Sequence, residues 1–323
     1  MFVFVFFLFF TATNGFNHRD CTRLGTDSRK SEVGTHDNNV MCDYMKRYNK
    51  NYLHKDDFWD RKKNVFGRVS HINKSSKTVN FGLNSISDRK FYNNMHLKHK
   101  SKIQGQHKLM LSSYHLPDEL DLREKMQPIK DQGQCGSCYT FAAASVLEYH
   151  AETSVSEQKL MDCSSSVNGP SYGCGGGWPE TLFEYALHYP VVSEEDQPYT
   201  AENHACNQTC SDSVVNIKSF GVIEMEKDAH SESRIPYILN THGPVVVALD
   251  VGTTELLMSY VDGIFPGIAC GTEPDHAVTI VGYTEDYWII RNSWGQDWGD
   301  DGYFYLERGV NACGVAGVIG YVV

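Results

Sequence analysis

The sequence predicts an α+β protein of two lobes, preceded by a separate basic segment. An Ala-rich, helix-like stretch at 138–148 comes before the strand-like part of the chain, and helices followed by strands are typical of the α+β class. Residues 1–116 carry 20 Lys and Arg against 9 Asp and Glu, whereas residues 117–323 carry 9 against 31. Four apolar stretches in the last third of the chain predict strands: 244–251, 277–283, 287–291 and 302–307.

The charge distribution limits the function classes. A net charge of −11 argues against nucleic acid as a partner, because phosphate binding requires clustered positive charge. A basic segment joined to an acidic one predicts two parts that attract each other or are later separated. Most of the Gly, Trp and Cys residues follow Leu116-Pro117, so we place a domain boundary near 113–117.

The first fifteen residues predict a secretory signal peptide. Residues 2–10 are apolar, and small residues suited to cleavage follow them. Nine residues are too few to span a bilayer, which needs about 20. A buried N-terminal strand is the alternative. No other apolar stretch approaches membrane length, so we expect a soluble product without a membrane span.

The segment 16–116 is polar and rich in Lys, His and Asn, and predicts a helical domain. Apolar and aromatic residues have helix-like spacing over 44–72, whereas 92–113 is dense in Lys and His and predicts an exposed stretch. The whole chain contains ten cysteines, which favours an oxidising compartment. Asn73 and Asn207 each begin an N-glycosylation sequon.

The Cys135-Gly136-Ser137-Cys138 motif admits three interpretations: a redox dithiol, half of a metal site, or one structural and one reactive cysteine. A redox motif requires a preceding βαβ unit, and none is visible. Zinc requires a second ligand pair at suitable spacing, which is also missing. Cys138 begins the helix-like stretch, where free backbone N–H groups and the helix dipole favour a thiolate. We therefore expect a nucleophile at Cys138.

A partner base is indicated at His276. Of the six histidines after residue 117, five lie among polar residues, whereas His276 is the first residue of an apolar strand-like stretch. Alone, such a histidine is ordinarily structural. Asn292 follows the next strand-like stretch, and pairing of the two strands would bring its amide oxygen to the imidazole and fix the ring's tautomer.

Together these residues resemble the papain-like cysteine peptidases. The signature of that family has a CG[SA]C[WY] block with a histidine and an asparagine roughly 130–150 residues downstream. His276 lies 138 residues after Cys138, and Asn292 lies 154 residues after it. Further blocks match the family at 117–123, 156–164, 173–178, 292–295 and 311–316.

The resemblance implies a two-lobed fold with a helical lobe and an antiparallel β-barrel lobe over 117–323. It implies Cys138 as nucleophile, His276 as general base and then acid, and Asn292 as the residue that orients His276. Gln132 would donate its amide to the oxyanion together with the backbone N–H of Cys138. The reaction is acyl transfer through a thioester. We expect no metal and no cofactor.

The basic segment fits the same family. Residues 82–88 resemble the G-x-N-x-F-x-D block of inhibitory propeptides, with Ile86 at the usual aromatic position. The resemblance implies that residues 16–116 form an intramolecular inhibitor lying through the cleft. We expect acid to release it, because protonated carboxylates attract it less. Charge serving only solubility is the alternative.

The family pattern also implies three disulfides, Cys135–Cys174, Cys163–Cys206 and Cys270–Cys313. Cys210 remains as a free thiol, an intermolecular partner, or a partner of Cys21 or Cys42. Tyr139 replaces the usual Trp after the nucleophile, and Leu122 replaces the Trp of a D-W-R block. Both departures affect packing positions.

For specificity, Gly176 and Gly177 resemble the stretch that pairs with the substrate backbone. An apolar pocket for the second residue before the cut predicts an aliphatic or aromatic preference, with core packing as the alternative for Trp178. The short interval between Cys163 and Cys174 leaves no room for an occluding insertion and favours endopeptidase activity. The remaining expected contacts are Trp178, Pro179, Ala277, Trp294 and Val318.

These inferences predict a cysteine endopeptidase made as an acid-activated zymogen, monomeric, acting on proteins and peptides. Its expected location is the secretory pathway, with an acidic lysosome-like or extracellular destination. One alternative is a dipeptidyl peptidase of the same family, suggested by Tyr139. A non-catalytic binding paralogue is another, and a thiol–disulfide oxidoreductase is a more distant third.

Overall fold

The structure is a computed structural model. The described residues are 16–17, 19–21, 32–72, 79–90, 115–167, 171–207, 212–224, 232–251, 256–271 and 273–323. The predicted signal peptide, Asn73, Cys210 and the whole stretch 92–113 lie outside them. Within the described residues, no helix is long and apolar enough to cross a membrane.

Three helices build one lobe, with α4 (Cys138–Ala151) at its centre and α5 (Glu157–Cys163) and α6 (Pro179–His188) against it. Residues 138–148 of α4 are all buried, so this helix is apolar on every side. Side-chain capping starts α5, since Ser156 Oγ accepts a hydrogen bond from the backbone N–H of Lys159. Proline starts α6, where the missing N–H costs nothing.

The second lobe is built on one sheet, in which neighbouring strands follow the order β1-β5-β8-β7-β6-β4-β9-β3, where β1 is Val79–Phe81 of the basic segment, and β2 pairs with β6. All pairs are antiparallel except β5 with β8. The strands of this lobe are β2 (Leu120–Asp121), β3 (Phe220–Glu224), β4 (Val245–Leu249), β5 (Tyr260–Phe265), β6 (His276–Tyr283), β7 (Tyr287–Arg291), β8 (Tyr303–Glu307) and β9 (Val318–Val322). One helix, α8 (Ile235–His242), packs on β6 and β9.

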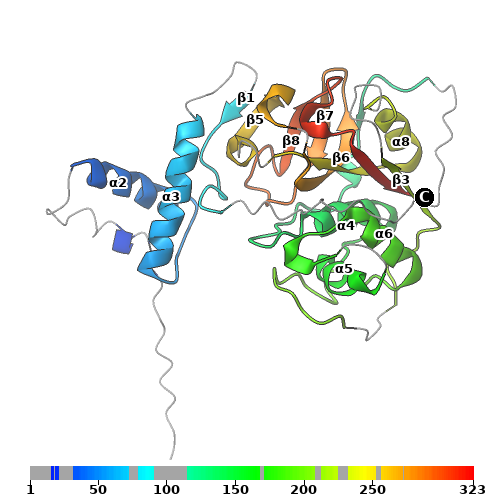
Figure 1. Ribbon diagram of the computed structural model, residues 1–323, viewed down its shortest axis with the longest axis horizontal. Coiled ribbons are helices and arrows are strands. Elements are labelled where there is room, and N and C mark those ends of the chain that lie inside the picture. Colours follow the sequence, from blue (N-terminus) through cyan, green and yellow to red (C-terminus); the bar gives the residue numbers. More distant parts are fainter. Residues whose placement is uncertain are drawn as a thin grey trace, which may run out of the picture.

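Short 3-10 helices connect these elements: η1 (Arg123–Lys125), η2 (Ser164–Ser166), η3 (Gly173–Gly175), η4 (Leu256–Ser259), η5 (Gly267–Ala269) and η6 (Ala312–Gly314). Figure 1 shows the α4–α6 lobe on one side of the sheet. The α+β class and the two-lobed architecture predicted from the sequence are confirmed, and the four predicted strands correspond to β4, β6, β7 and β8.

The two lobes meet where α4 packs on β6. Ala277 of β6 and Ala248 of β4 are buried in the same apolar cluster as the α4 side chains. Thr279 Oγ1 donates a hydrogen bond of 3.1 Å to the carbonyl oxygen of Ala142. This contact brings the first residue of α4 beside the first residues of β6.

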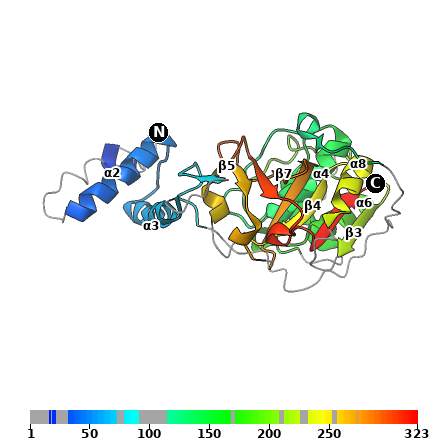
Figure 2. The same cartoon turned by 90° about the horizontal axis from the view of Figure 1, so that it is seen from above.

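The basic segment forms two helices, α2 (Glu32–Arg47) and α3 (Lys55–Ile72), followed by β1 (Val79–Phe81). The helix-like spacing over 44–72 is therefore split by a turn, in which Asn49 has a left-handed φ of 49°. β1 pairs with β5 and so extends the sheet of the second lobe. Figures 1 and 2 both show α2 and α3 at the end of the molecule beside β5.

Four disulfides are present among the described residues. Three of them join the pairs that the family resemblance implies: Cys135–Cys174, Cys163–Cys206 and Cys270–Cys313. The fourth joins Cys21 to Cys42 within the basic segment. Pairing of Cys210 with Cys21 or Cys42 is thus wrong, because those two cysteines bond to each other.

Candidate active site

Cys138 lies at the N-terminus of α4, buried where the two lobes meet. Its side chain is part of the apolar cluster of the helical lobe, and its Sγ accepts a 3.5 Å hydrogen bond from the backbone N–H of Ala277. We expected the helix N-terminus to favour a thiolate. In this closed state burial outweighs that effect and raises the pKa of the Cys138 thiol to about 12.

His276 and Asn292 are brought together by the pairing of β6 with β7. Nε2 of His276 lies 2.8 Å from Oδ1 of Asn292, and both side chains are buried. Trp294 covers this pair, with its ring centroid 4.8 Å from that of the imidazole. Burial lowers the pKa of His276 to about 4, although the hydrogen bond that its ring donates to Asn292 acts in the opposite direction.

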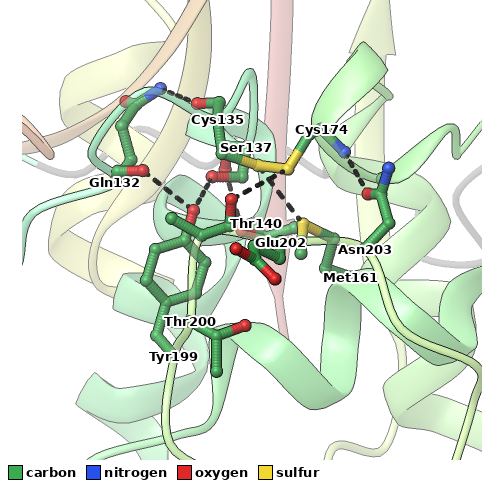
Figure 3. Close-up of a disulfide and its surroundings, with 12 residues drawn as sticks. Gln132, Cys135, Ser137, Thr140, Met161, Cys174, Tyr199, Thr200, Glu202 and Asn203 are labelled. Carbon is green, nitrogen blue, oxygen red and sulfur yellow. Dashed lines mark hydrogen bonds between the residues drawn. A yellow bond between two sulfur atoms is a disulfide. The ribbon is translucent and has the colours of Figure 1, made fainter. Parts of the chain in front are cut away.

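Gln132 is held beside Cys138 by hydrogen bonds at both ends of its amide. Its Nε2 donates to the carbonyl oxygen of Cys135 at 2.9 Å, and its Oε1 accepts from Ser293 Oγ at 2.6 Å. Figure 3 shows Gln132 to the left of the Cys135–Cys174 disulfide. The backbone carbonyl oxygen of Gln132 accepts a 2.9 Å hydrogen bond from the Tyr199 hydroxyl. The disulfide therefore anchors the loop that carries the amide.

One cavity has Gln132, Cys138, His276 and Trp294 in its lining. Three residues of the basic segment line the same cavity: Ile86, Arg89 and Lys90. Residues of the 86–90 segment thus line the same cavity as all of the predicted catalytic side chains except Asn292. In this form the site is covered by its own chain.

The predicted substrate contacts fall into two groups. Trp294 lines the cavity, and Ala277 contacts Cys138 through its N–H. Neither Ala277 nor the other five line that cavity. Gly176 follows η3 with a φ of 103°, and a side chain on Gly177 would collide with the Tyr139 ring at 2.6 Å. The remaining three occupy element ends: buried Trp178 and Pro179 at the start of α6, and half-buried Val318 at the start of β9.

The packing of Tyr139 explains how the chain accommodates a tyrosine where the family usually has Trp after the nucleophile. The side chain is fully buried, and its hydroxyl donates to the carbonyl oxygen of Gly173 at 3.2 Å and lies 3.2 Å from Ser171 Oγ. The ring fills the space over Gly177. The other departure, Leu122, is buried against Val281 in an apolar cluster of the β lobe.

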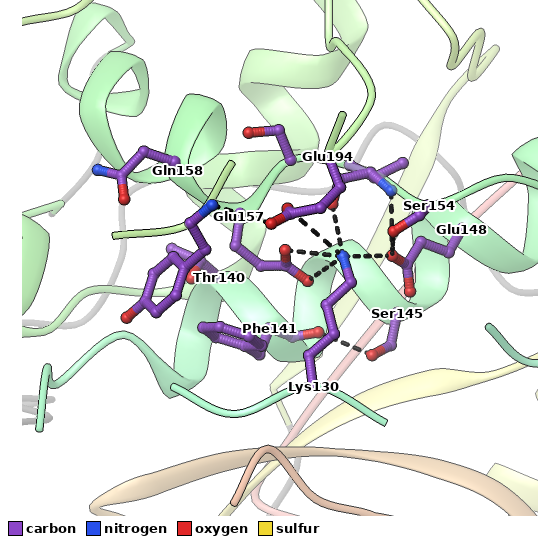
Figure 4. A network of polar contacts seen from close by, with 12 residues as sticks. Lys130, Thr140, Phe141, Ser145, Glu148, Ser154, Glu157, Gln158 and Glu194 are labelled. Atoms are coloured by element: carbon purple, nitrogen blue, oxygen red, sulfur yellow. Dashed lines mark hydrogen bonds and ion pairs between the residues drawn. The ribbon is translucent and has the colours of Figure 1, made fainter. Parts of the chain in front are cut away.

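Sequence reasoning missed a buried ionic cluster beneath the site. Lys130 Nζ lies 2.8 Å from Glu148 Oε1, 2.8 Å from Glu157 Oε2 and 3.7 Å from Glu194. Figure 4 shows the three carboxylates gathered around the ammonium, close to α4. Arg291 of β7 lies 4.0 Å from Glu148, which connects the cluster to the strand preceding Asn292.

The comparisons with known proteins agree with this arrangement. The model of the papain family of cysteine proteases matches residues 116–323. The chain therefore belongs to the papain family of cysteine proteases. It is a thiol protease with a propeptide-containing proform, and the segment beside β5 corresponds to that propeptide.

Relatives cover both the propeptide and the protease domain. Pro-cathepsin H of Mus musculus is 33% identical over 282 residues, covering 80% of this chain and 81% of that protein. The thiol protease aleurain of Arabidopsis thaliana is 34% identical over 277 residues, covering 79% and 75%. Digestive procathepsin L 3 from the Tenebrio molitor larval midgut has a TM-score of 0.75 at 29% identity, with 91% and 100% of the two chains covered.

Proposed function

We propose that the protein is a cysteine endopeptidase, with Cys138 as nucleophile and His276 as general base and acid. The observation that carries this proposal is the position of Cys138 at the start of α4, against the first residues of β6, together with the 2.8 Å hydrogen bond between His276 and Asn292. A nucleophile, a base and an orienting group in this order supply the parts that acyl transfer needs.

The reaction begins when the thiol proton of Cys138 moves to His276 and the sulfur attacks the scissile carbonyl carbon. A C–S bond forms and the carbonyl π electrons move to oxygen. His276 then gives its proton to the leaving nitrogen as the C–N bond breaks, which leaves a thioester. Water, deprotonated by His276, attacks the thioester, and the C–S bond breaks to release the acid and regenerate Cys138.

Asn292 orients the imidazole in this scheme. Its Oδ1 accepts the Nε2–H of His276, which leaves Nδ1 for proton exchange with sulfur. Trp294 excludes water from this hydrogen bond, because it packs on the ring face and is itself buried.

Gln132 supplies one donor for the oxyanion. Its Oε1 and one of its two Nε2–H groups are already fixed by Ser293 and Cys135, so the amide is preorganised before substrate arrives. The backbone N–H of Cys138, at the start of α4, is the second donor.

The proposed domain organisation is a signal peptide over 1–15, a propeptide over 16–116 and the peptidase domain over 117–323. Latency in this scheme comes from Ile86, Arg89 and Lys90, which lie against the catalytic residues. We expect cleavage near 113–117 and release in acid. Acid maturation in turn favours an acidic compartment reached by the secretory pathway. Asn207 is exposed and is therefore available for glycosylation along that pathway.

Endopeptidase action with an apolar residue two positions before the cut is the proposed specificity. Between Cys163 and Cys174 the described residues form the 3-10 helix η2 and the start of η3 at Gly173, so nothing described there closes the cleft. Gly176 and Gly177 are proposed to pair with the substrate backbone, and Trp178, Pro179, Ala277 and Val318 to form the apolar pocket.

The decisive experiment is acid maturation of the proform, followed by labelling with an epoxide cysteine-peptidase inhibitor and mass mapping. Label on Cys138 that is lost in His276→Ala supports an activated thiol. Absence of label after propeptide removal contradicts it and favours a binding paralogue. Two peptide substrates, one with a blocked N-terminus and one with a free N-terminal amine, separate the two activities. An endopeptidase cleaves the blocked peptide, whereas a dipeptidyl peptidase requires the free amine.

A further inference from the structure

Arg89 of the propeptide makes a two-pronged ion pair with Asp131, the residue before Gln132. Nη1 of Arg89 lies 2.7 Å from Oδ1 of Asp131, and Nη2 lies 2.6 Å from Oδ2. Parallel hydrogen bonds of this kind are the geometry by which a carboxylate recognises a guanidinium specifically. Arg89 is 17% exposed, so the pair is largely shielded from solvent on the guanidinium side.

The Asp131 carboxylate is positioned by the protease domain and not by Arg89 alone. Its Oδ1 accepts a 2.9 Å hydrogen bond from the backbone N–H of Gly133. Its backbone forms a β-bridge with Trp294, and the neighbouring Lys130 carbonyl accepts from the N–H of Gly295 at 3.1 Å. These contacts are made without the propeptide, so we expect the carboxylate to keep its place after the propeptide has gone.

Asp131 lies on the leaving-group side of the site. His276 must protonate the departing nitrogen, so the new N-terminal part of the substrate passes along the face that His276 and Trp294 form. Asp131 is bridged to Trp294 and directly precedes Gln132. Arg89 occupies this position in the proform, in a cavity it shares with His276 and Trp294.

We infer that Asp131 is a specificity residue of the mature enzyme, selecting substrates with a basic side chain, Arg above Lys, just after the cut. The inference rests on the proposed function, since it assigns one subsite of that activity. Propeptide removal takes away the guanidinium and leaves a preoriented carboxylate, 39% exposed even with Arg89 in place. The protease part of the chain, with 31 acidic against 9 basic residues, attracts such substrates from a distance.

The test compares two internally quenched peptides that differ only in the first residue after the cut, Arg or its uncharged isostere citrulline. The ratio of their kcat/KM values is measured at pH 6 with acid-matured enzyme. We expect wild type to prefer Arg about fivefold, the upper range for an ion pair that keeps some solvent contact. In Asp131→Asn the ratio falls to about one, and Asp131→Glu restores part of the preference.

A charge reversal and a matched control sharpen the result. Asp131→Lys is expected to prefer Glu over Gln at the same position. Glu285→Gln removes one exposed negative charge beyond the opposite end of β6, and is expected to keep the wild-type ratio. Raising the salt concentration to about 1 M reduces the preference of wild type, because exposed charges are then screened.

Two results overturn the inference while the proposed function stands: equal cleavage of both peptides by wild type, or an unchanged Arg preference in Asp131→Asn. Inhibitor labelling of Cys138 in each variant shows whether the site is folded. If wild type cleaves neither peptide and Cys138 takes no label, the proposed function itself is wrong, and the assignment of this subsite falls with it.

Discussion

Asn292 and His276 are sixteen residues apart in the chain but are joined by a buried hydrogen bond of 2.8 Å between Oδ1 and Nε2. The bond exists because β6 and β7 are antiparallel neighbours, with Thr279 opposite Arg291. His276 begins one strand and Asn292 follows the other, so both side chains reach the same edge of the sheet. The orientation of the imidazole is thus a direct product of strand pairing.

Removal of that bond should slow catalysis more than it weakens binding. For Asn292→Ala we expect kcat to fall by about 10²-fold with a smaller change in KM, because a misoriented imidazole loses part of the contribution of general acid–base catalysis. The pH dependence of kcat should also shift, since the imidazolium loses its acceptor. Steady-state kinetics on a blocked peptide measure both. An unchanged pH profile would contradict the positioning role.

Gln132→Ala tests the oxyanion donor. We expect kcat to fall by about 10²- to 10³-fold, in line with loss of one preorganised donor. The matched control is Gln134→Ala, two residues along the same loop, whose side chain is exposed. Equal losses in the two variants would show that Gln132 supports the loop and does not stabilise the oxyanion.

Reactivity of Cys138 should differ sharply between the proform and the mature enzyme. Burial raises the pKa of the Cys138 thiol to about 12 and lowers the pKa of His276 to about 4. The covered pair is therefore neutral at pH 7, and iodoacetamide should label Cys138 slowly until the pH is strongly alkaline. After maturation, water and substrate reach the site, and labelling should be rapid near pH 6. Equal labelling rates at pH 7 would contradict this.

Stability should depend on pH through Glu157. Burial raises its pKa well above the usual range, although Lys130 opposes this, and Glu148 adds to it. The excess of carboxylates supports this direction, since three of them surround Lys130. Among the described residues, Arg291 is the only other cation within 4.0 Å of these carboxylates. A carboxyl that binds its proton more tightly when folded stabilises the fold below about pH 4 and loses that contribution as pH rises through the folded pKa.

Glu157→Gln should therefore flatten the decline of Tm between pH 4.5 and 7.5, by at least about 2 °C over that range. The measurement uses thermal unfolding of the full chain carrying Cys138→Ala, which prevents self-cleavage. Glu285→Gln, an exposed site, is the matched control. Parallel Tm curves for the Glu157→Gln variant and the Cys138→Ala parent would show that Glu157 does not hold the extra proton.

The disulfide between Cys21 and Cys42 should help keep the zymogen latent. It closes a loop of 21 residues inside the small propeptide core, and both cysteines are buried there. The chain-entropy estimate for such a loop is about 3 kcal/mol. The double variant Cys21→Ser/Cys42→Ser is expected to mature several times faster at pH 5, followed by gel analysis of the full chain. Unchanged maturation would mean that the propeptide opens without unfolding this region.

Sequence predicted the elements whose signals are local. Strands β4, β6, β7 and β8 are continuous apolar or aromatic stretches, and the Cys138 helix is uniformly apolar. β5 was missed because Asp262 and Gly263 interrupt its pattern, and its place depends on β8 and β1, which lie far away in the chain.

The site was predicted in its chemistry but not in its surroundings. Charged residues such as Lys130 and Glu157 are ordinarily exposed, and only the packing of the helical lobe shows that they are buried together. The Arg89–Asp131 pair joins the propeptide to the protease across 42 residues. No local periodicity reports a partner of that kind, so it becomes visible only once both segments are placed.

The pairing of β1 with β5 has a consequence for the mature molecule. While β1 is present, β5 is an inner strand. Loss of the propeptide turns β5 into the outermost strand of the sheet, with backbone donors and acceptors uncovered. Such an edge can recruit a strand from another chain. Asp262, which accepts from Asn80 Nδ2 at 2.7 Å in the proform, then stands as an unmatched charge on that edge. Maturation thus opens the cleft and at the same time exposes a strand edge that favours self-association. The charge of the Asp262 carboxylate opposes strand pairing at that edge.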